Sequence, residues 1–145
     1  MIWKFEAVDK LKQYVAKRQS LQSIPLEIAQ VDLDMSSIRS ASADSTPVAG
    51  GGNGRENAML NHIVRKNELL RSLERAQKWV AAVDASLEVL SAEDRLILDR
   101  FYIYPEKGAA DRLAGDLHID VKTVYKRKDD ALRRFTISLY GETES

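Results

Sequence analysis

Basic side chains are concentrated between residues 122 and 134 of this 145-residue chain. Protonated amines and guanidinium groups neutralise phosphates, and a lysine can donate hydrogen bonds to the guanine acceptors in a DNA major groove. The segment is therefore a candidate DNA-binding site, and an ordinary solvated helix face is the alternative. Its six basic residues against two acidic ones are Lys122, Lys126, Arg127, Lys128, Arg133 and Arg134 against Asp129 and Asp130.

The surrounding residues predict a helix that would present these side chains. Asp120 stands just before the segment and is a typical helix N-cap, whose carboxylate would accept a hydrogen bond from the backbone of Lys122 or Thr123. A helix is therefore expected to begin at Val121. Its inward side would contain Val124, Ala131, Leu132, Phe135 and Leu139, and its outward side Lys122, Tyr125, Lys126 and Asp129.

The run from Gly108 to Phe135 has the residue pattern of a helix-turn-helix. Ala114 would lie where the two helices cross, because a small side chain lets the backbones approach. His118 occupies the turn position that usually holds glycine, so a left-handed backbone is expected there at a modest cost. A tight helical hairpin without DNA binding is the alternative. The small and apolar residues at the motif's offsets are Ala110, Leu113, Ala114, Leu117, Ile119 and Val124.

The second helix of such a motif enters the major groove, which makes residues 120–135 the predicted recognition helix. Some of its side chains would approach base edges and others would contact phosphates and fix the orientation. The base-edge set is Lys122, Tyr125 and Lys126, the phosphate set is Arg127, Lys128, Arg133 and Arg134, and Thr123 completes the predicted DNA-binding face.

The segment from Leu90 to Phe135 resembles region four of bacterial sigma factors, in which an L-x-x-x-[DE]-R-x-[IL]-[IL] helix precedes the helix-turn-helix. The whole chain is similar in layout to phage-encoded sigma-like regulators of the ArpU/RinA type, which end near a Leu-Tyr-Gly, here Leu139-Tyr140-Gly141. The resemblance implies transcriptional control of phage or prophage genes in the cytoplasm of a bacterial host. It implies double-stranded DNA as the partner and allows RNA polymerase as a second one.

Upstream of this segment, apolar spacing of three and four predicts long amphipathic helices. One is expected over Trp3 to Arg18, with Phe5, Val8, Leu11 and Val15 inward, and a second over Pro25 to Arg39. The apolar seam of the second is Leu21, Ile24, Ile28, Val31, Met35 and Ile38. A long helix over Glu56 to Leu90 would align Leu60, Ile63, Leu70, Leu73, Val80, Val83, Leu87 and Leu90, interrupted by Asn67 and Gln77.

These patterns predict an all-α protein in four parts. Residues 1–39 form an N-terminal helical module, 40–55 a flexible linker, 56–90 a connecting or oligomerisation helix and 91–141 the DNA-binding domain. Ser91 would cap the first helix of that domain, and Tyr104-Pro105 would end it. The stripe of the long helix could pack within one chain or against a second copy, and a homodimer is favoured because two motifs read a longer site.

Composition argues against several other classes of protein. The chain has no cysteine, which excludes disulfides and thiolate metal sites, and its net charge is zero. No apolar run reaches the roughly 18 residues of a membrane span. His62 and His118 lack metal-ligand spacing, and no carboxylate pair is placed for acid–base chemistry, so no enzyme, metal or cofactor is expected. The remaining alternatives are a DNA-binding subunit of a phage packaging machine and a module that contacts RNA polymerase through the acidic Asp84 to Asp99 segment.

Overall fold

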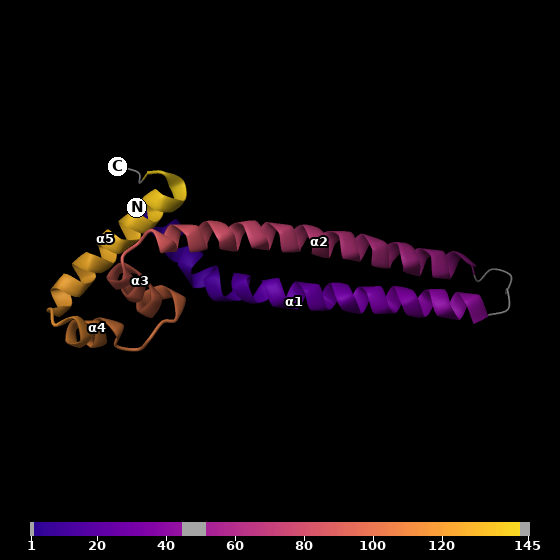
Figure 1. The fold of residues 1–145 in the computed structure, drawn as a ribbon, viewed down its shortest axis with the longest axis horizontal. Coiled ribbons are helices and arrows are strands. Elements are labelled where there is room, and N and C mark those ends of the chain that lie inside the picture. The colour runs from indigo at the N-terminus through magenta and orange to yellow at the C-terminus, as the bar shows by residue number, and fades with distance from the viewer. Residues whose placement is uncertain (1, 45–51, 143–145) are drawn as a thin grey trace. The chain divides into compact units, whose positions relative to one another are not determined.

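The computed structural model describes residues 2–44 and 52–142. Within these ranges it contains five α-helices and one π-helical turn, and no strand (Figure 1). The all-α prediction is therefore confirmed. The elements are α1 (Ile2–Asp44), α2 (Gly52–Glu88), α3 (Ala92–Leu98), the π-helical turn η1 (Asp99–Ile103), α4 (Ala109–Leu117) and α5 (Val121–Tyr140).

The chain divides into two compact units. The first, here called the α3–α5 unit, consists of residues 1–17 and 79–145, and the second, the hairpin unit, of residues 18–78. Each of the long helices α1 and α2 therefore contributes a segment to both units.

The first part of the chain corrects the sequence prediction. Two helices were expected, Trp3 to Arg18 and Pro25 to Arg39, but α1 is a single helix with Pro25 inside it. A proline in a helix interior removes one backbone hydrogen bond and crowds the preceding turn, at a cost of about 3 kcal/mol. Packing of Ile24 and Ile28 on the two sides of Pro25 against the hairpin core offsets that cost.

The predicted linker over residues 40–55 is also shorter on both sides. Residues 40–44 belong to α1 and residues 52–55 to α2, while residues 45–51 lie outside the described part of the chain. The glycines and small polar residues of this stretch favour a loop but do not fix where the flanking helices end.

The hairpin unit is held by a small apolar cluster between α1 and α2. The two helices lie side by side (Figure 1), and Val31, Met35 and Leu69 are buried between them. An ion pair joins Lys66 Nζ to Asp32 at 2.8 Å. The predicted seam of α1 thus faces α2. Ile24, Ile28 and Met59 complete the cluster.

The predicted stripe of α2 is confirmed in its later turns, where Val80 and Val83 are buried, but most of its earlier residues do not face α1 within the hairpin unit. Leu60, Ile63 and Leu70 are 57%, 41% and 44% exposed, whereas Leu69 and Ala76 are buried. Because neighbouring residues lie about 100° apart around a helix, α2 carries two apolar faces, and α1 covers only one of them.

The α3–α5 unit has a continuous core. Ile97, Leu113 and Val124 are completely buried where α3, α4 and α5 meet. Leu132 and Phe135 are also buried, as predicted for the inward side of α5. The remaining residues of the α3–α4–α5 cluster are Leu96, Phe101, Ala110, Ala114, Leu117 and Ile119.

In the first four turns of α1 the predicted Leu11 is completely buried, but the rest of the buried face differs from the prediction. Phe5 is 76% exposed, and the buried side is formed by Trp3, Ala7, Leu11 and Tyr14. Both sets have helical spacing, but the observed one buries two large aromatic residues in place of one, which removes more apolar surface from water.

The ends of α3 and η1 follow the sequence prediction. The Ser91 hydroxyl accepts a hydrogen bond from the backbone N–H of Asp94 at 3.1 Å. Tyr104 follows the last residue of η1 and precedes Pro105. Across residues 2–44 and 52–142, no helix has both the length and the apolar character needed to cross a bilayer.

Candidate nucleic-acid interface

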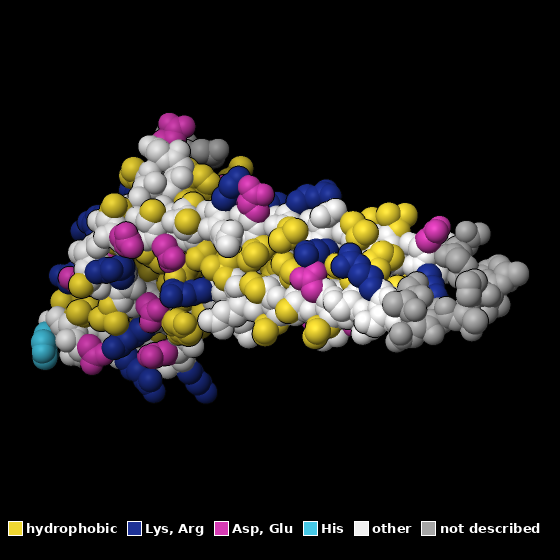
Figure 2. All heavy atoms as spheres, turned by 45° about the vertical axis from the view of Figure 1, so that its right-hand side comes forward, with side chains coloured by type: hydrophobic (Ala, Val, Ile, Leu, Met, Phe, Trp, Pro, Cys, Tyr) yellow, Lys and Arg dark blue, Asp and Glu magenta, His cyan; other side chains and the backbone are white. Residues whose placement is uncertain are grey.

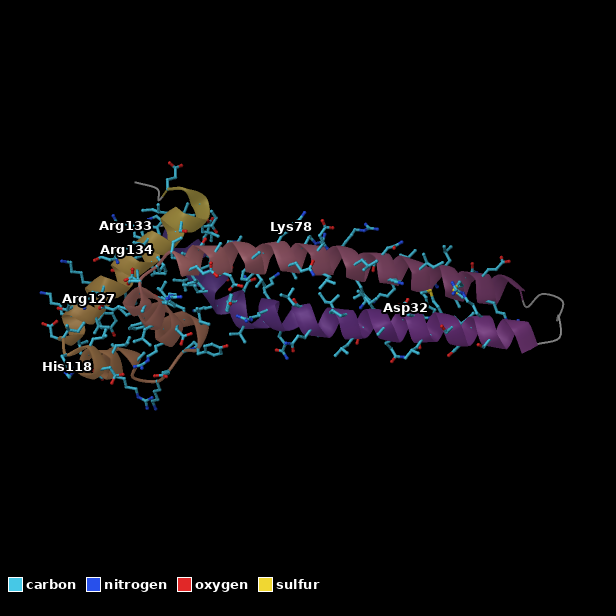
Figure 3. All side chains as sticks on the ribbon, in the orientation of Figure 1. Asp32, Lys78, His118, Arg127, Arg133 and Arg134 are labelled. Atoms are coloured by element: carbon cyan, nitrogen blue, oxygen red, sulfur yellow. The ribbon has the colours of Figure 1, made fainter. Side chains whose placement is uncertain are left out.

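The site is built around the three-residue turn between α4 and α5. His118 has φ 57° and ψ 45°, and in the described part of the chain it is the one residue other than glycine with a positive φ. The backbone N–H groups of His118 and Ile119 both donate to the carbonyl of Ala114, which closes the turn. The predicted left-handed backbone at His118 is confirmed, and Figure 3 shows this residue at the junction of the two helices.

Asp120 fixes the start of α5. Its Oδ1 accepts a hydrogen bond from the backbone N–H of Thr123 at 2.7 Å, so the predicted N-cap is confirmed. Hydrogen bonds from the side chain and the backbone of Thr123 hold the pKa of Asp120 below its ordinary value. Thr123, predicted to belong to the DNA-binding face, is therefore half-buried and engaged in the cap.

The packing of α4 on α5 includes two small side chains. Ala110 and Ala114 lie beside the cluster in which Leu113 of α4 meets Val124 of α5. Because protein interiors are closely packed, this cluster positions α5 relative to α4. All the residues that the sequence placed at the helix-turn-helix offsets belong to the α3–α4–α5 cluster.

One face of the first turns of α5 remains open. Lys122, Tyr125 and Lys126 are exposed, Tyr125 by 47%. Lys122 and Lys126 make no salt bridge within the described residues. Their spacing of four places them on the same side of the helix. The structure thus brings together the three side chains that sequence analysis assigned to base edges.

Tyr125 and Lys128 belong to an aromatic and cationic cluster. The Tyr125 ring lies 6.0 Å from the ring of Phe101, and Lys128 Nζ lies 4.9 Å from the first ring centroid and 5.1 Å from the second. A cation over two aromatic faces is held electrostatically. One side of Tyr125 is therefore fixed by Phe101 and Lys128, which limits its side-chain freedom.

The arginines of α5 have partners within the chain. Arg127 forms an ion pair with Glu93, and Arg134 Nη1 contacts both carboxylate oxygens of Asp94, at 2.8 and 3.0 Å. The Asp94 side chain is only 9% exposed, whereas that of Arg134 is 58% exposed. These pairs connect α5 to α3. Figure 3 shows the two arginines and Arg133 along α5.

Two further charged residues of α5 also contact the first turns of α1. Arg133 Cζ lies 5.8 Å from the ring centroid of Trp3, a buried residue. Asp129, predicted on the outward side, pairs with Lys4 Nζ at 3.1 Å. Every residue of the predicted phosphate-contacting set therefore has a contact inside the protein, a feature with no signal in the sequence.

The acidic Asp84 to Asp99 segment is largely engaged inside the same unit. Asp84 accepts a hydrogen bond from the hydroxyl of Tyr14, and Glu93 and Asp94 hold the arginines of α5. Asp99 is partly buried, and burial raises its pKa, with a further contribution from Glu106.

The exposed amines of Lys122 and Lys126 can donate hydrogen bonds, and no metal-binding cluster lies among the described residues. In the part of the chain that the structure describes, no three histidine, cysteine or acidic side chains are grouped as ligands for a metal ion.

No family model, characterised protein or solved structure matches this chain. The resemblance to sigma region four and to ArpU/RinA-type regulators therefore rests on the residues quoted above, chiefly Leu90 to Phe135 and Leu139 to Gly141.

Proposed function

We propose that this protein binds double-stranded DNA with the first turns of α5 and thereby regulates transcription of phage or prophage genes. The observation that carries the proposal is the open face of Lys122, Tyr125 and Lys126, which directly follows a capped helix start. The other cations of α5 have partners inside the protein, so this face offers the basic side chains that are free for a ligand.

The local geometry suits a helix-turn-helix. In that motif the second helix lies in the major groove, and residues near its amino-terminal end reach base edges. The left-handed turn at His118 and the N-cap at Asp120 place Lys122 in the first turn of α5 and Lys126 in the next. Lysine amines at these positions could donate to the O6 and N7 acceptors of guanine.

The arginines would act differently from our sequence-based expectation. A guanidinium group has five N–H donors, so a half-exposed arginine that binds a carboxylate can still donate to a phosphate. Arg134 and Arg127 would therefore contribute chiefly by fixing α5 on α3, and only secondarily by contacting the DNA backbone.

Among the alternatives, contact with RNA polymerase through the acidic segment has less support than DNA binding. Asp84, Glu93 and Asp94 are already bound to groups of the same unit. Regulation of transcription, as opposed to DNA packaging, is inferred from the resemblance to sigma-like regulators.

The proposal is tested by binding of the purified chain to duplex DNA. A sequence selected from a random duplex pool is compared with a scrambled duplex at two salt concentrations, for the wild type, Lys126→Ala and Lys12→Ala. Lys12 is an exposed lysine on α1 and serves as the matched control. We expect Lys126→Ala to lose about tenfold or more of the preference for the selected duplex, and Lys12→Ala to keep it.

Two results would contradict the proposal. The absence of wild-type binding to any duplex at low salt would exclude DNA as the partner of this face. Equal effects of Lys126→Ala and Lys12→Ala would show that binding is a property of overall charge and does not depend on the open face of α5.

A further inference from the structure

Two apolar side chains lie beside the lysines at the start of α5. Val121 and Tyr125 are 36% and 47% exposed, whereas Val124 between them is completely buried. Their spacing of four places them on the same side of the helix, one turn apart. Each directly precedes a lysine, Lys122 or Lys126, so the apolar pair and the lysine pair form neighbouring strips about 100° apart around α5. Figure 2 shows hydrophobic side chains next to lysine or arginine side chains at the surface of the part of the molecule that contains α3, α4 and α5.

The side chain of Tyr125 is restrained by its neighbours in the same unit. Its ring lies 6.0 Å from the ring of Phe101, and Lys128 Nζ lies 4.9 Å from its centroid. A side chain that becomes immobile only on binding loses rotamer freedom, which lowers affinity. A ring that already has a fixed position avoids most of this loss. Tyr125 is therefore suited to a specific contact through the exposed part of its ring.

Val121 is restrained by the start of the helix. It is the first residue of α5 and directly follows the N-cap Asp120, whose Oδ1 accepts the hydrogen bond from the backbone of Thr123. A β-branched side chain in a helix has one strongly preferred rotamer. Single exposed apolar residues are common at protein surfaces and carry no function by themselves. Here, however, two restrained ones occupy successive turns of the proposed recognition helix.

Thymine is the base that presents an apolar group in the major groove. Its C5-methyl group projects there, and the other three bases are distinguished by their hydrogen-bond donors and acceptors. Valine and tyrosine side chains can bury a methyl group by van der Waals contact, while the lysines of the neighbouring strip can donate hydrogen bonds to guanine. The two strips together therefore match a groove in which a thymine methyl group lies close to guanine acceptors.

We propose that Val121 and Tyr125 select thymine in the DNA site by burying its C5-methyl group between them. This inference rests on the proposed function, because it requires α5 to lie in a major groove. It adds Val121, which the sequence analysis did not assign to the DNA-binding face, to the residues that determine specificity. It also assigns base recognition to the ring of Tyr125 and not to its hydroxyl group.

Uracil tests this assignment, because it pairs like thymine and lacks only the C5-methyl group. In the duplex selected from the random pool, each thymine is replaced in turn by uracil, and wild-type binding is measured by mobility shift. The loss of one buried methyl group should weaken binding about fourfold. We therefore expect one thymine at which the replacement has an effect of about this size on the wild type.

Variants of the apolar pair show which side chains contact the methyl group. Val121→Ala and Tyr125→Ala should bind the thymine duplex more weakly than the wild type does, and the uracil replacement should cost each of them less than it costs the wild type. Tyr125→Phe should keep the full effect of uracil, because it retains the ring and loses only the hydroxyl group. Val89→Ala is the matched control, since Val89 is 71% exposed and lies outside α5, and it should also keep the full effect.

Circular dichroism verifies that the variants are folded. Tyr125→Ala removes a ring that contacts Phe101 and Lys128, so Val121→Ala decides the test if Tyr125→Ala loses helical content.

Two results would overturn this inference and leave the proposed function intact. One is a selected duplex that contains no thymine, or in which no uracil replacement weakens wild-type binding. The other is a uracil effect that is as large in Val121→Ala as in the wild type. The absence of binding to any duplex at low salt would instead refute the proposed function, and this inference with it.

Discussion

The first turns of α5 and its later turns carry the same kind of charge but hold it in different ways. Lys122 and Lys126 are exposed and form no salt bridge within the described residues, while Arg127 and Arg134 bind the carboxylates of Glu93 and Asp94 on α3. One helix therefore carries a set of cations that is available to a ligand and another that fastens the helix to its neighbour.

The difference shows why the density of basic residues is a poor measure of a binding surface. A helix that packs on a neighbour with acidic residues has part of its charge neutralised there. The remaining free charge, and not the total, sets the counterions released when a polyanion binds. In α5 the free charge is concentrated next to the left-handed turn, where a recognition helix would approach a groove.

The largest expected effect concerns the later turns. Arg134→Ala leaves the Asp94 carboxylate, whose side chain is 9% exposed, without its partner. An unpaired buried polar or charged group costs about 1–3 kcal/mol, and we expect a loss in the free energy of unfolding within this range, measured by urea denaturation. Lys126→Ala is the control from the first turns and should change stability by less than about 0.5 kcal/mol. Equal stability of Arg134→Ala and Lys126→Ala would contradict the distinction between the paired arginines and the exposed lysines of α5.

Removing the N-cap of α5 tests how Lys122 and Lys126 are positioned. Asp120→Ala should lower Tm by a few degrees, because the N–H of Thr123 loses its acceptor. The pKa of Asp120 is lowered in the folded state, so its contribution is complete above the ordinary value of 3.8 and is lost as the pH falls below it. The wild type and the variant should therefore converge in stability at acidic pH. A difference that grows as the pH falls would contradict this role.

The turn before α5 gives an effect in the opposite direction. His118→Gly should stabilise the protein by less than about 1 kcal/mol, since a left-handed backbone is strained for histidine, while glycine adds flexibility to the unfolded chain. Gly108 also has a left-handed backbone, with φ 72°, so Gly108→Ala is the matched control and should destabilise. Thermal unfolding of both variants measures these changes in stability. Destabilisation by His118→Gly would show that the imidazole side chain itself stabilises the fold.

The smallest expected effect separates the two arginines. Arg127→Ala should cost no more than about 1 kcal/mol in the free energy of unfolding, and less at high salt, because Arg127 and Glu93 are 42% and 39% exposed. A cost equal to that of Arg134→Ala, measured by urea denaturation in parallel, would mean that burial of the carboxylate does not distinguish the two pairs.

Local signals made the region from Ser91 to Phe135 predictable from the sequence. The caps at Ser91 and Asp120, the left-handed His118 and the small residues at the helix crossing depend on residues a few positions apart. The ion pairs of Arg127 and Arg134 join residues 34 and 40 positions apart, and nothing in a charge pattern indicates which partner a long side chain will find.

The long helices were less predictable for a different reason. Two apolar faces with helical spacing coexist in α2, and two alternative stripes coexist in the first turns of α1, so periodicity alone does not choose the buried one. Trp3 and Tyr14 are buried in place of Phe5 because their packing removes more surface from water. Tertiary packing likewise overrides the local preference of Pro25 to interrupt a helix.

The most direct test of the central claim is the protection of individual lysines by DNA. The protein is treated with a limiting amount of an amine-acetylating reagent with and without duplex DNA, and the modification of each lysine is measured by mass spectrometry. We predict that DNA protects Lys122 and Lys126 and leaves Lys12, an exposed lysine of α1, unchanged. Equal modification of all three lysines with and without bound DNA would contradict the assignment of the first turns of α5 as the DNA-binding face.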